Sequence, residues 1–221
     1  MPVDYPKTET QRNKMKETST QLTAKNGGRN LLDITIKVAS IPKIVINTFQ
    51  LRLVGDSPLL MHKWSEKALK EMEDKQAKKP RQAKEAKDPH QCYLDSIYRD
   101  AQGNAAFPAV AFKNAAVDAC SHCEGITKVE ARGAFHVVGN LVRIIGDHVM
   151  QRDTVRLAMG VADLRYRAAF PDWSCVLDIR HNPNVLTMDQ IINLFSLGGF
   201  AIGIGEWRPQ KDGSYGMFHV A

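Results

Sequence analysis

The first clear pattern in the chain is an alternation of apolar and polar residues that predicts a β-strand over Ile44–Val54. In its second half, Phe49, Leu51 and Leu53 fall on one side and polar residues fall on the other. This is the period of a strand with one buried face. The tetrapeptide that follows, Gly55-Asp56-Ser57-Pro58, is rich in turn-forming residues. We therefore expect a half-buried strand that ends at this turn.

Two segments have the spacing of helices. Pro108 leads into a run of small residues from Ala109 to Cys120, which predicts a helix that can approach a sheet closely. Further along, Thr187 and Gln190 are three residues apart, as in a capping box at the start of a helix. Apolar residues follow at helical spacing, and we expect this second helix to end at Gly198-Gly199.

The other apolar runs predict strands. Residues 135–145 read as one strand with a bend at Gly139. Residues 174–180 read as another, and residues 217–220 as the last strand of the sheet. Two further segments alternate basic with apolar residues, namely 155–158 and 164–167.

Taken together, these elements predict an α+β fold. Their order is strand, helix, strand, strand, helix, strand, which is the βαββαβ plan of ferredoxin-like and RRM-like domains. In that plan an antiparallel sheet carries both helices on one face. The other face and its rims are where RNA-recognition motifs hold single strands.

Two regions stand outside this plan. Residues 1–40 are predicted to be a flexible N-terminal arm, because the polar segment Met1–Gly28 cannot bury enough apolar surface to offset its ordering entropy. Residues 41–221 are predicted to form the RRM-like domain, with a lysine-rich charged insertion at about 65–100. The insertion is open to two interpretations, a basic flap over a nucleic acid or a solvated helix.

Composition narrows the function classes. The 221 residues suffice for one domain with an insertion, and a hydrophobic content of 43% is ordinary for a globular protein. A net charge of +6 favours a polyanionic partner. No apolar run is long enough to span a membrane, and the polar N-terminus lacks the apolar core of a signal peptide. We expect a cytoplasmic protein with no membrane partner.

The richest chemical signal is a glycine loop near the C-terminus. Six glycines fall within the nineteen residues Gly198–Gly216, which allows close approach of another backbone or of a phosphate. Consecutive amides in such a loop can form an anion nest. Trp207, Arg208, Lys211 and Tyr215 add aromatic surfaces and positive charge, so the loop is a candidate for nucleic-acid contact.

The cysteines and the known catalytic motifs add little. Cys120 and Cys123 have the spacing of half a zinc site, but no second pair matches them, and reduced thiols are the expected state. We predict no metal and no cofactor. Phosphate-binding and nucleophile-elbow motifs do not occur in the chain, which argues against a nucleotide-driven enzyme or a triad hydrolase.

Two of these motifs resemble a known superfamily. The Gly198–Gly216 loop resembles the signature loop of the repeat-associated RNA-binding (RAMP) superfamily of CRISPR effector complexes. The segment Phe107–Ala116 is similar to the proline-led helix entry of its backbone-type subunits. The similarity covers about residues 44–64 and 104–221. A phage or mobile-element relative would fit equally well.

The resemblance implies a non-catalytic subunit of a ribonucleoprotein in antiviral defence. Such a subunit polymerises along single-stranded RNA, so its partners would be RNA, copies of itself and other subunits of an RNA-guided complex. We predict that cations follow the phosphates while aromatic side chains stack on or wedge between bases. The predicted contacts are Lys63, Trp64, Lys113, Arg165, Arg167, Trp207, Arg208, Lys211 and Tyr215.

Three alternatives stay open. A single-strand DNA binding or annealing protein of phage recombination would show the same signals, because no short motif separates RNA from DNA. A metal-independent endoribonuclease could use His62 as general acid or base, with Lys63 beside it as a cation. A protein-interaction module that mimics or caps an RNA-guided complex is the third.

Overall fold

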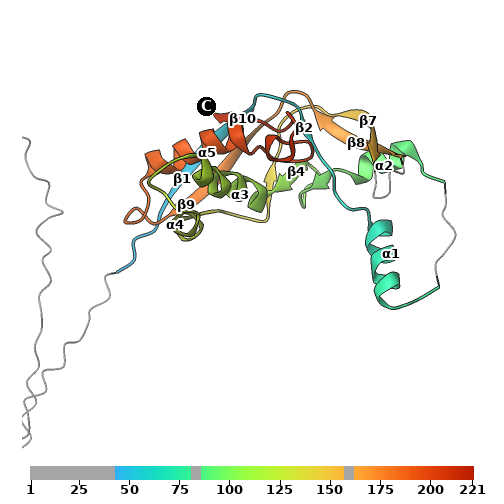
Figure 1. Ribbon diagram of the computed structural model, residues 1–221, viewed down its shortest axis with the longest axis horizontal. Helices are drawn as coiled ribbons and strands as arrows, with labels where there is room; N and C mark the ends of the chain where they lie inside the picture. The colour runs from blue at the N-terminus through green and yellow to red at the C-terminus, as the bar shows by residue number, and fades with distance from the viewer. Residues whose placement is uncertain (1–42, 81–85, 157–161) are drawn as a thin grey trace, which may run out of the picture. The chain divides into compact units, whose positions relative to one another are not determined.

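The computed structural model describes residues 43–80, 86–156 and 162–221 (Figure 1). The predicted arm, residues 1–40, lies outside these ranges. The chain divides into two units, Met1–Ile44 and Val45–Ala221, and the description below concerns the second. Within the described ranges, no helix is long and apolar enough to cross a membrane.

The central feature of this unit is a four-stranded antiparallel sheet with the strand order β10-β1-β9-β5. Along the chain, the sheet strands and the two helices that pack on them come in the order β1, α3, β5, β9, α5, β10. The prediction of an α+β fold with an antiparallel sheet is thus confirmed. The bounds are β1 Asn47–Gly55, α3 Ala109–Ala119, β5 Phe135–Val137, β9 Ser174–His181, α5 Met188–Ala201 and β10 Phe218–Val220.

The core lies between this sheet and helices α3 and α5, which pack side by side (Figure 1). Leu51 and Leu53 of β1 are buried, as the alternation predicts, and they pair with Leu177 and Cys175 of β9. Phe112 of α3 is also fully buried. The burial of these apolar faces is the main force that holds the helices on the sheet.

The outward face of the sheet is polar and exposed. Gln50 and Arg52 of β1 alternate with the buried leucines, and Asp178 and Arg180 of β9 lie on the same face. Gln50 Nε2 donates to Asp178 Oδ1 across the two strands at 2.9 Å.

The second helix begins where the sequence predicts but ends later. Thr187 and Gln190 form a complete capping box at the start of α5. The predicted end at Gly198-Gly199 is wrong, because both glycines lie inside the helix. A Cβ on Gly198 would lie 2.8 Å from the Ala115 carbonyl oxygen, and one on Gly199 would lie 1.8 Å from the Phe218 carbonyl oxygen. These glycines permit close packing and do not stop the helix.

The predicted strand over residues 135–145 is in fact two strands in different sheets. The chain leaves β5 near Gly139, which has a positive φ of 87°, and enters β6 (Leu141–Arg143). There β6 pairs with β4 (Ala105–Pro108), which in turn pairs with β3 (Tyr98–Arg99). The bend at Gly139 therefore moves the chain from one sheet to another.

A third sheet is built around a long hairpin, which we call the ribbon. Its strands are β7 (Val149–Arg156) and β8 (Ala162–Phe170), and β8 also pairs with β2 (Leu59–Leu60). The two base-alternating segments fall on the ribbon, although residues 157–161 lie outside the described ranges.

The charged insertion divides into two parts. Helix α1 (Glu66–Gln76) is capped by Ser65 and buries no residue. Helix α2 (Pro89–Asp95), by contrast, packs against β8, and the Ser96 hydroxyl after it accepts from the Ala168 amide at 2.9 Å. The second half of the insertion thus belongs to the core. Within the described ranges, the unit also has the short helix α4 (Lys128–Ala134) and 3-10 turns at Cys120–His122 and Pro209–Lys211.

Candidate functional site

The glycine loop between α5 and β10 is held by its own backbone hydrogen bonds. The Ile204 amide donates to the Gly216 carbonyl at 3.0 Å, and the Tyr215 amide donates to the Trp207 carbonyl at 2.9 Å. The Glu206 amide donates to Leu60 of β2, also at 3.0 Å. These three amides are therefore committed within the chain and are not free to bind an anion.

Two of the loop glycines are required by close approach. A Cβ on Gly213 would lie 1.8 Å from the Trp207 carbonyl oxygen. One on Gly216, whose φ is +65°, would lie 1.8 Å from the Ile204 carbonyl oxygen. The glycines therefore let two arms of the loop press together, and the loop presents its side chains from a rigid backbone.

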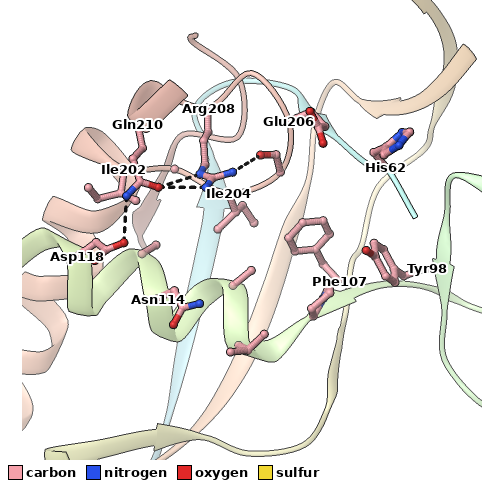
Figure 2. Close-up of a pocket in the computed structure, with 16 residues that line it drawn as sticks. His62, Tyr98, Phe107, Asn114, Asp118, Ile202, Ile204, Glu206, Arg208 and Gln210 are labelled. Carbon is pink, nitrogen blue, oxygen red and sulfur yellow. Dashed lines mark hydrogen bonds between the residues drawn. The ribbon is translucent and has the colours of Figure 1, made fainter. Parts of the chain in front are cut away.

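Between the end of α5 and β10, Trp207 is the most exposed aromatic side chain, whereas the more exposed Phe200 lies in the last turn of α5. Trp207 is 43% exposed, and its backbone has a left-handed φ of 55°, an uncommon conformation for a bulky residue. Lys211 beside it is exposed. Arg208 is held in place, since its guanidinium donates to the Gly205 carbonyl at 3.0 Å and to Gln210 Oε1 at 3.1 Å (Figure 2).

A hollow of about 370 Å³ lies between the loop and α3 (Figure 2). Its polar lining includes His62, Tyr98 and Glu206 at one end, while Asn114 lies farther along α3. Phe107 contributes an apolar wall near the polar end. The volume falls within the range of small-ligand pockets, about 300–1,000 Å³.

His62 lines this hollow, and one of its ring nitrogens is unpaired in the described part of the chain. Its Nδ1 is buried and has no hydrogen-bond partner within the described residues. Burial lowers the pKa of His62 below its ordinary value, the Glu206 carboxylate opposes that shift, and Arg165 and Arg167 reinforce it. We therefore expect a neutral imidazole at pH 7, which can accept a proton or a hydrogen bond.

The prediction that Arg167 is a surface contact is wrong. Its side chain is buried, and its guanidinium pairs with Asp153 of β7 at 2.8 Å and with Glu206 of the glycine loop at 3.6 Å. The sequence analysis placed Arg167 among the nucleic-acid contacts because basic and apolar residues alternate over 164–167. The ribbon, however, meets the loop at this point, so both faces of the strand are covered. Arg167 thus joins the ribbon to the loop.

Several other predicted contacts gather near this junction. The Trp64 ring is 54% exposed and lies 6.5 Å from the His62 ring, centre to centre. Arg165 is partly exposed, 3.9 Å from Asp163, and the Tyr215 hydroxyl accepts from Gln151 of β7 at 3.3 Å. Lys63 is half-buried, and its amide donates to Ser96 at 2.9 Å.

Lys113 lies on another side of α3. Its ammonium donates to the Arg132 carbonyl and to His136 Nδ1, both at 2.9 Å, so it faces α4 and β5. The neighbouring Asn114 lines the hollow instead. The structure therefore does not bring Lys113 together with the loop contacts.

The sequence prediction missed most of the polar lining residues, including Glu206, Tyr98 and Asn114. Glu206 stands inside the glycine motif and directly before Trp207, so its position was a usable signal. Tyr98 belongs to the predicted insertion, and no local pattern could have placed it beside the loop. Asn114 falls within the helix-entry motif, where helical spacing drew attention to its neighbour Lys113.

The described residues offer little to a metal ion. Within them, no three histidine, cysteine, aspartate or glutamate side chains gather as a metal site would require. Cys120 is buried, and that burial raises the pKa of its thiol. Burial also raises the pKa of Cys175, to about 12.

Comparison with known proteins gives only distant likenesses, all among solved structures. No family model matches the chain, and no curated protein matches it. Among solved structures, the chain is similar to the crystal structure of Cmr6 from Pyrococcus furiosus, at 10% sequence identity and a TM-score of 0.45. The similarity covers 81% of this chain and 100% of that chain. A likeness this distant carries no inference about what the chain binds.

Proposed function

We propose that this chain is a non-catalytic subunit that binds single-stranded nucleic acid, RNA by preference, and assembles in several copies along the strand. The observation that carries the proposal is Trp207, an exposed aromatic side chain held in a left-handed backbone directly before Arg208. Its neighbours in the proposed interface are Trp64 from the end of β2 and Arg165 from the ribbon.

The strain at Trp207 is the physical core of the argument. A non-glycine residue in this region costs about 1–3 kcal/mol, and such strain concentrates at functional sites. Exposure of a tryptophan adds the unfavourable hydration of a large apolar ring. A base stacked on the ring would remove that surface from water and contribute about 1–3 kcal/mol.

The cations of the proposed interface support binding to a polyanionic strand. Lys211 is exposed and Arg165 and Lys63 are partly exposed, so their cations can reach phosphates. Arg167 serves this interface indirectly, by fixing the ribbon against the loop. Lys113 remains a predicted contact at a separate place.

The fold plan is a further support. The order β1, α3, β5, β9, α5, β10, with sheet order β10-β1-β9-β5, supports the proposal of a ferredoxin-like βαββαβ arrangement. RRM domains with this plan hold single-stranded RNA by stacking and shape. The motif resemblance to RAMP backbone subunits favours RNA and the assembly of several copies.

The test is binding of labelled single-stranded RNA, single-stranded DNA and duplex DNA across a salt series. We expect salt-sensitive binding to RNA, with larger assemblies on longer strands seen by mass photometry. Trp207→Ala should weaken binding at least about tenfold, the equivalent of about 1.4 kcal/mol, while Trp207→Phe retains most of it. Val129→Ala, an exposed apolar position on α4, is the matched control. Failure to bind any of the three would refute the proposal, and tighter binding to DNA would point to recombination.

A second candidate function follows from His62. His62 and Glu206 both line the hollow, and a histidine beside a carboxylate is an acid–base pair that cleavage at a 2′-hydroxyl can use. Gels of RNA incubated with the protein and a chelator test this reading. Cleavage that disappears in His62→Ala and persists in Val129→Ala would establish a metal-independent endoribonuclease, whereas intact RNA would remove it.

A further inference from the structure

We infer that the hollow between the glycine loop and α3 receives one nucleobase turned out from the bound strand, and that Glu206 selects guanine. This inference rests on the proposed function, since it names a subsite within the same interface. It concerns the interior of the hollow, whereas Trp207 and Lys211 lie on the loop outside its lining.

The shape of the hollow suits a flat ring. Its volume is about 370 Å³. Two apolar side chains line it from different elements, Phe107 from β4 and Ile204 from the glycine loop. The Tyr98 and Phe107 rings lie edge to face, 5.8 Å apart, which fixes the wall at the polar end. Extruded bases are held in this way, between aromatic or apolar side chains with polar groups at the edge.

The charges of the lining favour a neutral base over a phosphate. Asp118 and Glu206 are anionic, and Arg208 is the cation that lines the hollow within the described ranges. Arg208 is already committed to Gly205 and Gln210. Asp118 is committed to Lys128 at 2.9 Å and to Gln210 at 3.0 Å. A phosphate would therefore meet net negative charge inside, so the sugar–phosphate backbone stays at the mouth.

Glu206 supplies the selectivity. Its Oε2 lies 3.6 Å from Arg167, longer than a hydrogen bond, and its side chain is 44% exposed. An ionised carboxylate only accepts hydrogen bonds, through two oxygens. The Watson–Crick edge of guanine presents two adjacent N–H donors. Adenine, cytosine and uracil each place an acceptor beside their donor, which would face the carboxylate unfavourably.

The other polar groups complement the rest of a guanine ring. The Tyr98 hydroxyl and the Asn114 amide line the hollow. Burial raises the pKa of Tyr98, so its hydroxyl stays protonated and can donate. Guanine O6 and N7 are acceptors that such donors can meet.

The experiment uses uridine oligoribonucleotides with one central guanosine, inosine, adenosine, cytidine or abasic position. We expect guanosine to bind about tenfold more tightly than the abasic strand. Inosine, which lacks the exocyclic amine, should lose part of this gain, and adenosine and cytidine most of it. Free guanosine is added as a competitor to separate a strand-borne base from a free nucleoside.

Two variants locate the effect in the hollow. Glu206→Gln should abolish the guanosine preference, and Glu124→Gln, an exposed glutamate elsewhere, should keep it. Val110→Trp places a large ring in the hollow from an exposed helix position that is 60% accessible, and Val129→Trp is its control. Thermal melts confirm that each variant is folded, so a lost preference is not a lost fold.

The possible outcomes distinguish failure of the proposed function from failure of the guanine inference. No binding to any strand overturns the proposed function. Equal binding to all central residues overturns the inference and leaves the proposed function standing. A guanosine preference that persists in both Glu206→Gln and Val110→Trp shows that the guanine site lies outside the hollow. If free guanosine binds as tightly as the strand, the hollow is a site for a free nucleoside, and the inference of a base turned out from a strand is refuted.

Discussion

Replacement of Gly199 by alanine tests the packing that holds the glycine loop to the sheet. Gly199 lies in the last turn of α5, where the helix crosses β10. The alanine Cβ would lie 1.8 Å from the Phe218 carbonyl oxygen and 2.7 Å from its carbonyl carbon. Ordinary contact begins at 3.4 Å, so helix and strand must separate by 3.4 − 1.8 = 1.6 Å or bend around the methyl group.

The expected loss of stability follows from two opposing effects. Overpacking of a well-packed site costs about 1–3 kcal/mol, and this case lies at the upper end because the obstacle is backbone. Alanine in a helix gains back about 1 kcal/mol relative to glycine. We expect Gly199→Ala to lower the free energy of unfolding by about 2 kcal/mol, measured by urea titration with the m-value held equal.

Gly133→Ala provides the matched control. Gly133 lies in α4, and a Cβ there would meet nothing within 4 Å. The same substitution should therefore raise stability by about 0.5 kcal/mol, since only the helix propensity changes. If Gly199→Ala were as stable as the parent chain, or if both variants shifted stability in the same direction, the close packing of α5 on β10 would be refuted.

Further predictions concern charge and burial. Asp153→Asn should lower the free energy of unfolding by about 3 kcal/mol in a urea titration, because it removes the nearer partner of the buried Arg167. Glu206 is farther from Arg167 and half-exposed, so Glu206→Gln should lower it by under about 1 kcal/mol. Equal losses would contradict this ranking. Since burial lowers the pKa of His62, the unfolded chain takes up a proton first as pH falls through 6.5, so stability decreases below that pH. His62→Gln should make that decrease shallower, and an unchanged slope would argue against the shift. The Cys175 thiol, with a pKa of about 12, should resist a thiol reagent at neutral pH until urea unfolds the chain; fast labelling of the folded protein would show that it is accessible.

Local patterns predicted local structure well. The alternation through Leu51 and Leu53 placed β1 and its buried face correctly, because a strand with one covered face needs only its own period. The Thr187 capping box likewise marked the start of α5, since both of its hydrogen bonds lie within four residues. These features depend on neighbours in the sequence, and the sequence contains all of them.

The features that failed depend on distant partners. Gly199 was predicted to end the helix because glycine is common at helix ends. Glycine is needed there instead because the Phe218 carbonyl on β10, nineteen residues later, leaves no room for a side chain. Arg167 was predicted to contact a nucleic acid, but Asp153 and Glu206 come from other elements to pair with it. The hollow combines Tyr98 from the insertion with Glu206 from the loop, and no single window of sequence contains both.

The internal hydrogen bonds of the glycine loop also bear on the thermodynamics of recognition. Amides such as those of Ile204, Glu206 and Tyr215 are satisfied before any partner arrives, so they should exchange slowly with solvent deuterium. A loop that is already ordered loses little conformational entropy on association. Most of the conformational entropy lost on binding would then be lost by the flexible strand. A strand whose bases are already stacked should therefore bind more tightly than a fully flexible strand, because its entropic penalty is smaller.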